Sequence, residues 1–166
     1  MNVLAISGSL RRDSHNTNLL RSAAQLAPDD VSIELWDGLR DVPPFDEDNE
    51  ASELAAVAQM RTAVAGADAV LFATPEYNSS IPGQLKNAID WLSRPKVTAA
   101  LRNKPVAVIG ASTGAFGAVW AQAELRKVLA ASGARVVEGD VAVGHAPQRF
   151  DENGILDDED LRGQLA

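Results

Sequence analysis

Five short apolar runs, each followed by a loop and a helical pattern, most constrain how this chain can fold. The strongest is Ala69–Ala73, with the sequence AVLFA, which is apolar at every position. A strand of this kind is buried on both faces of its sheet, which is typical of parallel sheets covered by helices. The alternation of strand and helix along the chain therefore predicts an α/β fold, with a doubly wound parallel sheet and helices on both faces.

The other elements follow from hydrophobic periodicity and from glycine, proline and capping residues. Further strands are expected at Val3–Ile6, Val31–Trp36 and Val106–Ile109, with a last strand region at Ala134–Val137 and Val141–Val143. Helices are expected at Asn18–Leu26, Ser52–Val64, Gly83–Ser93, Trp120–Ala131 and Asp157–Leu165, with Ser52 as an N-cap, Asp157 at a helix start and Gly133 just past a helix end. Residues 37–50 are expected to form an acidic surface loop. No repeat or second core is found, which predicts one domain over residues 1–166.

Composition excludes several classes of protein. There are 15 basic and 23 acidic residues, giving a net charge of -8. Without a basic cluster, nucleic acid and anionic membrane surfaces are not expected as partners. Cysteine is absent, which excludes disulfides, thiolate zinc sites and a cysteine nucleophile. The first residues lack the charged start and long apolar run of a signal peptide, and no segment approaches the ~18 apolar residues of a membrane span, so a cytoplasmic location is expected.

The loop at residues 7–17 follows the first buried strand and precedes a helix. In parallel sheets ligands bind beyond the carboxyl ends of the strands, and a helix N-terminus adds free N–H groups that bind phosphate. The patterns GxGxxG and GxxxxGK[ST] are both absent, so a lone terminal phosphate is expected rather than the pyrophosphate of a dinucleotide. An ordinary N-cap beside solvated arginines is the alternative. The side chains expected to bind the phosphate are Ser9, Arg11, Ser14, Asn16 and Thr17.

Two further loops follow the central strands. The loop Thr74–Gly83 contains two prolines and Tyr77, the only tyrosine of the chain. It can offer an aromatic face and fixed backbone amides to a planar heterocycle, or it can be a rigid turn in which Tyr77 covers the core. The loop at residues 110–117 is rich in small residues that permit close approach of a flat ligand, although a flexible turn has the same composition.

Residues for direct catalysis are not evident. The two histidines, His15 and His145, have no metal-ligand partner at a usual spacing, so no metal site is expected. Asp140 and His145 could form a triad with Ser7 or Ser9, but no G-x-S-x-G elbow is present. A phospho-acceptor domain needs acidic residues after the first strand and an aspartate at the end of the third. This chain has Ser7–Ser9 and Thr74–Pro75 at those places. A site without acid, base, nucleophile or metal indicates that a cofactor carries the chemistry.

Three segments together resemble the NAD(P)H-dependent FMN reductases, a group that includes quinone, chromate and azo-dye reductases. They are Gly8–Arg11 with Ser14 and Asn16, then Pro75–Asn78, then Ile81–Trp91, and the similarity covers nearly the whole chain in order and spacing. The resemblance implies a flavodoxin-like, five-stranded sheet of order 2-1-3-4-5 and one FMN per subunit, with its phosphate in the first loop. It places the isoalloxazine ring against Pro75, Glu76, Tyr77 and Asn78, with Ser112 closing the site; the third loop follows the family only loosely.

The resemblance also implies an enzyme in which the flavin, rather than a side chain, is the catalytic group. NADPH or NADH gives a hydride to flavin N5 and leaves, and a small acceptor (a flavin, quinone, chromate, azo or nitro compound) is then reduced in a ping-pong sequence. The family forms homodimers or homotetramers, with the helix Leu85–Leu92 and the loop before it at the interface. Two alternatives remain open: a flavodoxin-like one-electron carrier, which usually holds its flavin between aromatic rings, and a non-catalytic nucleotide-binding module.

Overall fold

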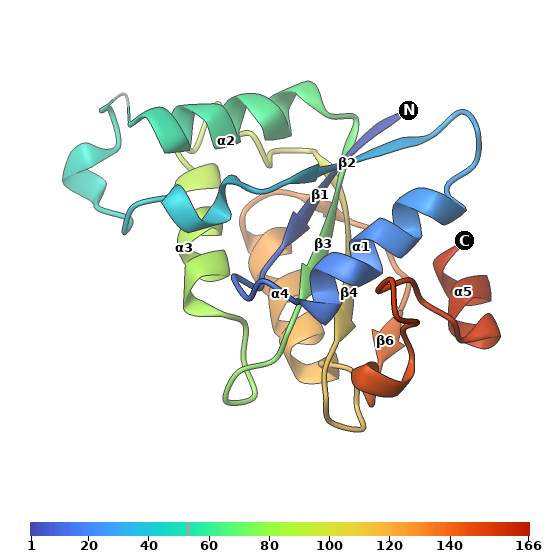
Figure 1. Cartoon of the computed structure of the whole chain (residues 1–166). Helices are drawn as coiled ribbons and strands as arrows, with labels where there is room; N and C mark the ends of the chain where they lie inside the picture. Colours follow the sequence, from blue (N-terminus) through green and yellow to red (C-terminus); the bar gives the residue numbers. More distant parts are fainter. Residues whose placement is uncertain (53) are drawn as a thin grey trace.

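The computed structural model describes residues 1–52 and 54–166, and it confirms the α/β class and the order of the strands. The sheet follows the order β2-β1-β3-β4-β5 with all neighbours parallel, and β6 also pairs with β4 (Figure 1). The strands are β1 (Asn2–Ser7), β2 (Ser32–Trp36), β3 (Ala69–Thr74), β4 (Pro105–Ala111), β5 (Arg135–Val136) and β6 (Ala142–Val143). The order reverses between β1 and β3, which puts the ligand crevice of such a sheet beyond their carboxyl ends.

Helices cover both faces of the sheet, as Figure 1 shows. The helices are α1 (His15–Leu26), α2 (Ala55–Gly66), α3 (Gly83–Leu92), α4 (Val119–Ala131) and α5 (Glu159–Leu165). One core joins residues of α2, α3 and α4 to bulky strand residues such as Ile6 and Phe72. The second core packs α1 and α5 against smaller ones such as Ala5 and Ala73. Successive strand residues point to opposite faces of the sheet. Neighbouring residues such as Ala5 and Ile6 therefore pack against different sets of helices.

The last strand region is divided into two short pieces that occupy the same side of β4. β5 pairs with the start of β4 and β6 pairs with its end. Between them, the Arg126 side chain donates one hydrogen bond to the Val108 carbonyl of β4 (3.0 Å) and another to the Gly139 carbonyl (2.8 Å). The Val108 carbonyl would accept a backbone N–H if the last strand were continuous. Because Arg126 donates to it instead, the chain leaves the sheet between β5 and β6.

Two helix starts differ from the sequence prediction by three residues each. α1 begins at His15 rather than Asn18, because the Ser14 hydroxyl caps it by accepting a hydrogen bond from the Thr17 N–H (3.3 Å). Ser52 was expected to cap α2, and this is wrong: the helix begins at Ala55, while Ser52 continues a preceding turn by donating its N–H to Asn49 (2.9 Å). Glu53, within the predicted helix range, lies outside the described residues.

Two helix boundaries nearer the C-terminus, the start of α5 and the end of α4, agree more closely with the prediction. α5 is capped by Asp158, which accepts from the Leu161 N–H (3.0 Å), one residue after the expected Asp157. Gly133 follows α4 with a φ of +88°, a left-handed conformation that glycine adopts without steric cost and that confirms its predicted place after the helix.

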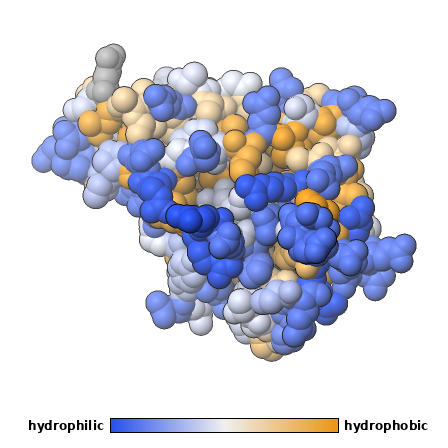
Figure 2. All heavy atoms as spheres, in the orientation of Figure 1, coloured by the Kyte–Doolittle hydropathy of each residue, from blue (hydrophilic) through white to orange (hydrophobic). Residues whose placement is uncertain are grey.

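The acidic connection between β2 and α2 contains two short 3-10 helices, Gly38–Asp41 and Glu47–Asn49. It is fixed to α3 by Asn87, which accepts from the Phe45 N–H (2.6 Å) and donates to the Pro43 carbonyl (2.8 Å). Hydrophilic residues cover most of the face of the molecule shown in Figure 2, with apolar residues visible between them. Within the described ranges, none of the helices has the length and apolar character needed to cross a bilayer.

We expect Ser22→Ala to destabilise the fold. Ser22 is fully buried in α1, and its hydroxyl accepts the N–H of Leu156 (2.9 Å), which anchors the C-terminal segment to this helix. The substitution leaves that buried N–H without its partner, at a cost of about 1–3 kcal/mol. Urea denaturation measures the loss. Ser132→Ala is the control, because that hydroxyl only donates back to a carbonyl of its own helix; equal losses in the two variants would contradict the anchoring role.

Candidate functional site

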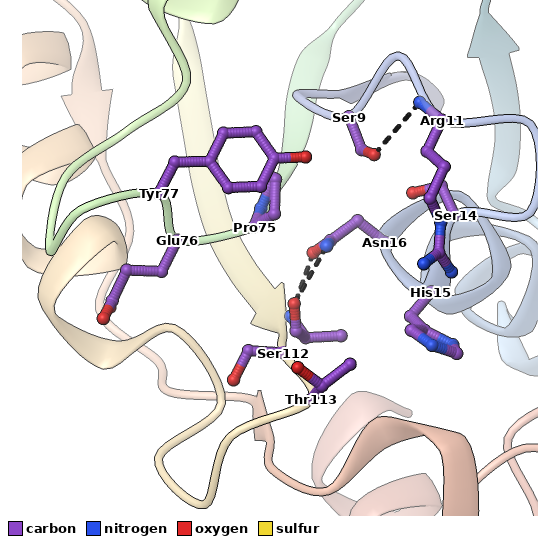
Figure 3. A pocket seen from close by; sticks show the side chains of 11 residues that line it. Ser9, Arg11, Ser14, His15, Asn16, Pro75, Glu76, Tyr77, Ser112 and Thr113 are labelled. Carbon is purple, nitrogen blue, oxygen red and sulfur yellow. Dashed lines mark hydrogen bonds between the residues drawn. The ribbon is translucent and has the colours of Figure 1, made fainter.

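Three loops meet at the carboxyl edge of the sheet and enclose a pocket. The register pairs Ser7 with Ala73 and Thr74 with Gly110, so β1, β3 and β4 end at the same level. Figure 3 shows the pocket between these loops and the start of α1. It is lined by Ser9, Arg11, Ser14, His15, Asn16, Pro75, Glu76, Tyr77, Ala111, Ser112 and Thr113. Eight of the ten predicted cofactor residues are therefore brought together here, and Thr17 and Asn78 are not.

Hydrogen-bond donors gather on the side of the pocket formed by the first loop. Ser9 and Ser14 present hydroxyls, and the first turn of α1 presents N–H groups that have no partner within the helix. The Arg11 N–H donates to Ser9 Oγ (3.3 Å), and the Arg11 guanidinium donates from Nε to the Asp13 carbonyl (3.0 Å). These contacts shape the loop around the start of the helix, where the positive end of the helix dipole favours an anion.

Thr17 and Asn16 use their side chains for internal bonds. The Thr17 hydroxyl donates to Ser7 Oγ (3.0 Å) and lies outside the pocket. The Asn16 amide donates to the Ala111 carbonyl and accepts from the Ala111 N–H, both at 2.9 Å. Asn16 is only 3% exposed. Its amide therefore fixes the start of α1 to the end of β4, and only its backbone N–H remains for a ligand.

The second loop forms a tight turn at its tip. Tyr77 and Ser80 exchange two backbone hydrogen bonds of 3.0 and 3.1 Å. Between them Asn78 and Ser79 both have positive φ angles, 53° and 61°, as in a type I′ turn. This turn carries Asn78 to the exposed tip, away from the pocket. Tyr77 is 51% exposed, so it does not cover the core, and Figure 3 shows its ring beside Pro75 and directed toward the first loop.

Glu76 carries the only carboxylate among the described residues that line the pocket. Its Oε2 accepts a hydrogen bond from the Ala121 N–H (3.1 Å) in the first turn of α4. The negative charge is therefore directed to a second helix N-terminus, on the far side of the pocket from the first loop. The donor side of the pocket is left free of competing anions.

The third loop is held in shape by the segment that follows β6. The Ala146 N–H donates to the Ser112 carbonyl (3.0 Å), and the His145 N–H donates to the Gly114 carbonyl (2.9 Å). Gly144 is required here, since a Cβ at this position would lie 2.1 Å from the Ala115 carbonyl oxygen. A loop with this many fixed contacts is a rigid wall of the pocket rather than a flexible turn.

Sequence reasoning missed His15, Ala111 and Thr113 as pocket residues. His15 is the first residue of α1, and recognition of Ser14 as the N-cap would have placed it there. Partial burial, and then the charge of Arg11, lower the pKa of His15 below its usual value. Ala111 and Thr113 carry no distinctive signal in the sequence. Among the described residues, no three His, Asp or Glu side chains are grouped so that they could hold a metal ion.

The arrangement fits a ligand that has an anionic group at one end and a flat ring at the other. Hydroxyls, helix N–H groups and Arg11 occupy the first end, whereas Pro75, Tyr77 and the rigid third loop form the second. A terminal phosphate suits such a donor set, because it is a dianion with several acceptor oxygens.

Comparison with known proteins gives concordant matches. The model of the family described as NADPH-dependent FMN reductase matches residues 1–148. A 2-hydroxy-1,4-benzoquinone reductase from Burkholderia sp is 38% identical over 99% of this chain and 90% of that protein. An NAD(P)H-dependent FMN reductase from Pseudomonas aeruginosa is 44% identical over 96% of this chain and 86% of that protein. The solved structure of FerB, a flavoenzyme NAD(P)H:(acceptor) oxidoreductase from Paracoccus denitrificans, has a TM-score of 0.86 and 34% identity, covering 99% of this chain and 92% of that chain.

We expect Asn16→Ala to lower the stability of the cofactor-free protein. The change leaves the buried N–H and carbonyl of Ala111 without partners, at a cost of roughly 2–6 kcal/mol for the two groups. Urea denaturation measures the free energy of unfolding. Asn18→Ala is the matched control, because the Asn18 side chain accepts a single exposed hydrogen bond from Arg21. Unchanged stability of Asn16→Ala, with flavin affinity lost, would instead indicate a direct ligand contact of the amide.

Proposed function

Since this chain belongs to the NADPH-dependent FMN reductase family, we propose that it uses bound FMN to transfer reducing equivalents from NAD(P)H to a small acceptor. The observation that carries the proposal is the division of the pocket into a donor end without carboxylates and a flat, rigid end. FMN has a terminal phosphate and a planar ring, so the residues present fit this cofactor. The family assignment independently names FMN and NADPH.

The phosphate end of the proposed site is made by α1 and the loop before it. We assign the Ser9 and Ser14 hydroxyls, the Arg11 guanidinium and the backbone N–H of Asn16 to the phosphate. Their chemistry supports this assignment, because each donates hydrogen bonds and all line one side of the pocket. Thr17 and Asn78 are left out, since the first bonds Ser7 and the second lies on an exposed turn.

The ring end is assigned to Pro75, Glu76 and Tyr77 of the second loop and to Ser112 and Thr113 of the third. When bound, FMN supplies the redox chemistry by accepting a hydride at N5 and passing electrons on to the acceptor. The protein residues orient the ring through fixed backbone groups and exclude water from one of its faces. Because the side chain of Glu76 is engaged with α4, its contribution to the ring is through the backbone.

Quinones are the proposed acceptors, because a benzoquinone reductase is 38% identical to nearly the whole chain. Flavins, chromate, azo and nitro compounds remain alternative acceptors, because each would meet the same exposed face of the flavin. We propose a ping-pong order, in which the oxidised nicotinamide leaves before the acceptor enters. What supports this order is the half-exposed Tyr77 at the ring end, which leaves that end of the pocket open for a nicotinamide and then an acceptor to reach the flavin in turn.

We also propose that the protein acts as a homodimer or homotetramer in the cytoplasm, where NAD(P)H is available. Four large apolar side chains lie exposed on the second loop, on the third loop and at the start of α4: Tyr77, Phe116, Val119 and Trp120. Phe116 and Trp120 contact one another edge to face at 5.1 Å. Exposed apolar side chains gathered in this way support an interface that includes the loop before α3.

The proposed function predicts a yellow protein that consumes NADPH or NADH when a quinone is supplied. Double-reciprocal plots at several quinone concentrations should give parallel lines, because no ternary complex forms in a ping-pong sequence. Steady-state absorbance at the nicotinamide band is the measurement. A yellow protein that oxidises neither nicotinamide would indicate the one-electron carrier, and a protein without flavin affinity would indicate the nucleotide-binding module.

Arg11→Ala should weaken FMN binding by about 1.5–3 kcal/mol, the range for a hydrogen bond to a charged group. Riboflavin, which lacks the phosphate, should bind the variant and the parent equally well. FAD should bind the parent more weakly than FMN, because its adenylate would find no dedicated site. Flavin fluorescence quenching of the apoprotein measures all three affinities.

The matched control is Arg12→Ala, which removes the neighbouring arginine outside the pocket. It should leave FMN affinity nearly unchanged. A fall in riboflavin affinity as large as that for FMN in Arg11→Ala would contradict the phosphate contact, and would assign Arg11 to the shape of the loop.

A further inference from the structure

His15 lines the flavin pocket, but the proposed function gives it no role. Its side chain forms a wall between this pocket and a second, polar hollow that lies between α1 and the segment at residues 147–154. In the second hollow its ring stacks on Phe150, with ring centroids 5.8 Å apart and planes 19° from parallel. Figure 3 shows the imidazole next to Ser14 and Arg11, on the donor side of the pocket.

The groups around His15 are charged and belong to two segments of the chain. On and before α1 they include three arginines and an aspartate, and across the second hollow they include two acids. Glu76 lies on the far side of the pocket and is bonded to α4. The full set is Arg11, Arg12, Asp13 and Arg21 from the first segment, with Asp151 and Glu152 from the second. The Asp151 carboxylate accepts the N–H groups of Ile155 and Asn153, which lowers its pKa and keeps it ionised near neutral pH.

In the protein without a ligand, these surroundings disfavour a positive charge on the imidazole. Burial and Arg11 both lower the pKa of His15, and the positive end of the α1 dipole acts in the same direction. His15 is therefore neutral at neutral pH, and its ring serves as a stacking partner for Phe150.

We propose that His15 is a proton-linked ligand of the FMN phosphate, taking up one proton from solvent when the phosphate occupies the donor end of the pocket. The inference rests on the proposed function. A phosphate dianion next to Arg11 and Ser14 reverses the local electrostatic field, so an imidazolium becomes favourable where it was unfavourable before. His15 and the phosphate then form a charge pair, and the stack on Phe150 keeps the ring in place.

The sign of the pH dependence follows from linkage. If phosphate binding raises the pKa of His15, the protonated protein binds FMN more tightly than the neutral one. This gain is complete below the pKa of the free protein and is lost as the pH rises through the higher pKa of the complex. The phosphate itself takes up a proton near pH ~6, which weakens binding at low pH and opposes the gain. Comparing variants at each pH cancels this second effect.

The test measures FMN affinity by fluorescence quenching between about pH 5 and about pH 8. His15→Phe keeps an aromatic ring against Phe150 but cannot take up a proton, and His15→Gln removes the proton while keeping a polar side chain. We expect both to bind FMN about as well as the parent at the upper pH. At the lower pH both should bind about tenfold more weakly, the ratio for a pKa rise of one unit on binding. Riboflavin should show no such difference at any pH.

A second readout does not depend on the variants. The chain has only two histidines, so proton NMR resolves the imidazole of His15 from that of His145. FMN should raise the pKa of His15. His145→Asn is the control for the affinities, because His145 lies outside the pocket with a φ of 50°, which asparagine tolerates.

The outcomes separate this inference from the proposed function. Tight FMN binding with a constant ratio between variants and parent, and no NMR shift of His15, would overturn the inference and leave His15 as a stacking wall. Failure of the parent to bind FMN at any pH would overturn both. A growing ratio toward low pH together with the NMR shift would establish the proton-linked contact.

Discussion

The two hydrogen bonds between the Asn16 side chain and the Ala111 backbone fix the geometry on which the site depends. They join the first turn of α1 to the last residue of β4, two elements that are separated by 95 positions in the sequence. The N–H groups of this turn form the donor end of the pocket, and the third loop leaves the sheet directly after Ala111. Because a buried amide that loses its partner costs more than an exposed one, this junction has one strongly preferred arrangement.

The contact is possible because the two faces of the sheet carry side chains of different size. Toward α1 the strands present three alanines, Ala5, Ala73 and Ala111, beside larger residues such as Ile109, whereas the opposite face buries Phe72 among its strand residues. Small residues allow α1 to lie close to the strands, so a side chain as short as asparagine reaches the backbone of β4. The core beneath α2, α3 and α4 contains most of the buried apolar residues. The side of the sheet beneath α1 contains the Asn16 contact that positions the pocket.

Much of the fold could be predicted from the sequence, because buried strands are marked by unbroken apolar runs and their loops by glycine, serine and proline. The pocket residues Ser9, Arg11 and Tyr77 were predicted for the same reason. The partners of the Asn16, Thr17 and Asn78 side chains could not be predicted. Amides and hydroxyls bind a ligand, a distant backbone group or solvent equally well, and tertiary packing decides between these partners. Two separate runs were predicted for the last strand region, but the contact that separates them was not, since it depends on where Arg126 of α4 meets β4.

The contacts that hold the third loop have a consequence for the order in which the protein becomes functional during synthesis. The loop takes its shape from hydrogen bonds to residues 145 and 146, and Leu156, later still, closes against Ser22 of α1. Translation proceeds from the N-terminus, so the loop at residues 7–17 leaves the ribosome first, but the pocket that it lines is complete only after residues 145, 146 and 156 have emerged. A ligand that needs all three loops therefore binds only after these residues have emerged. A nascent chain that stalls before β6 emerges would leave the end of β4 with unpaired backbone N–H and C=O groups, an edge to which another strand can pair.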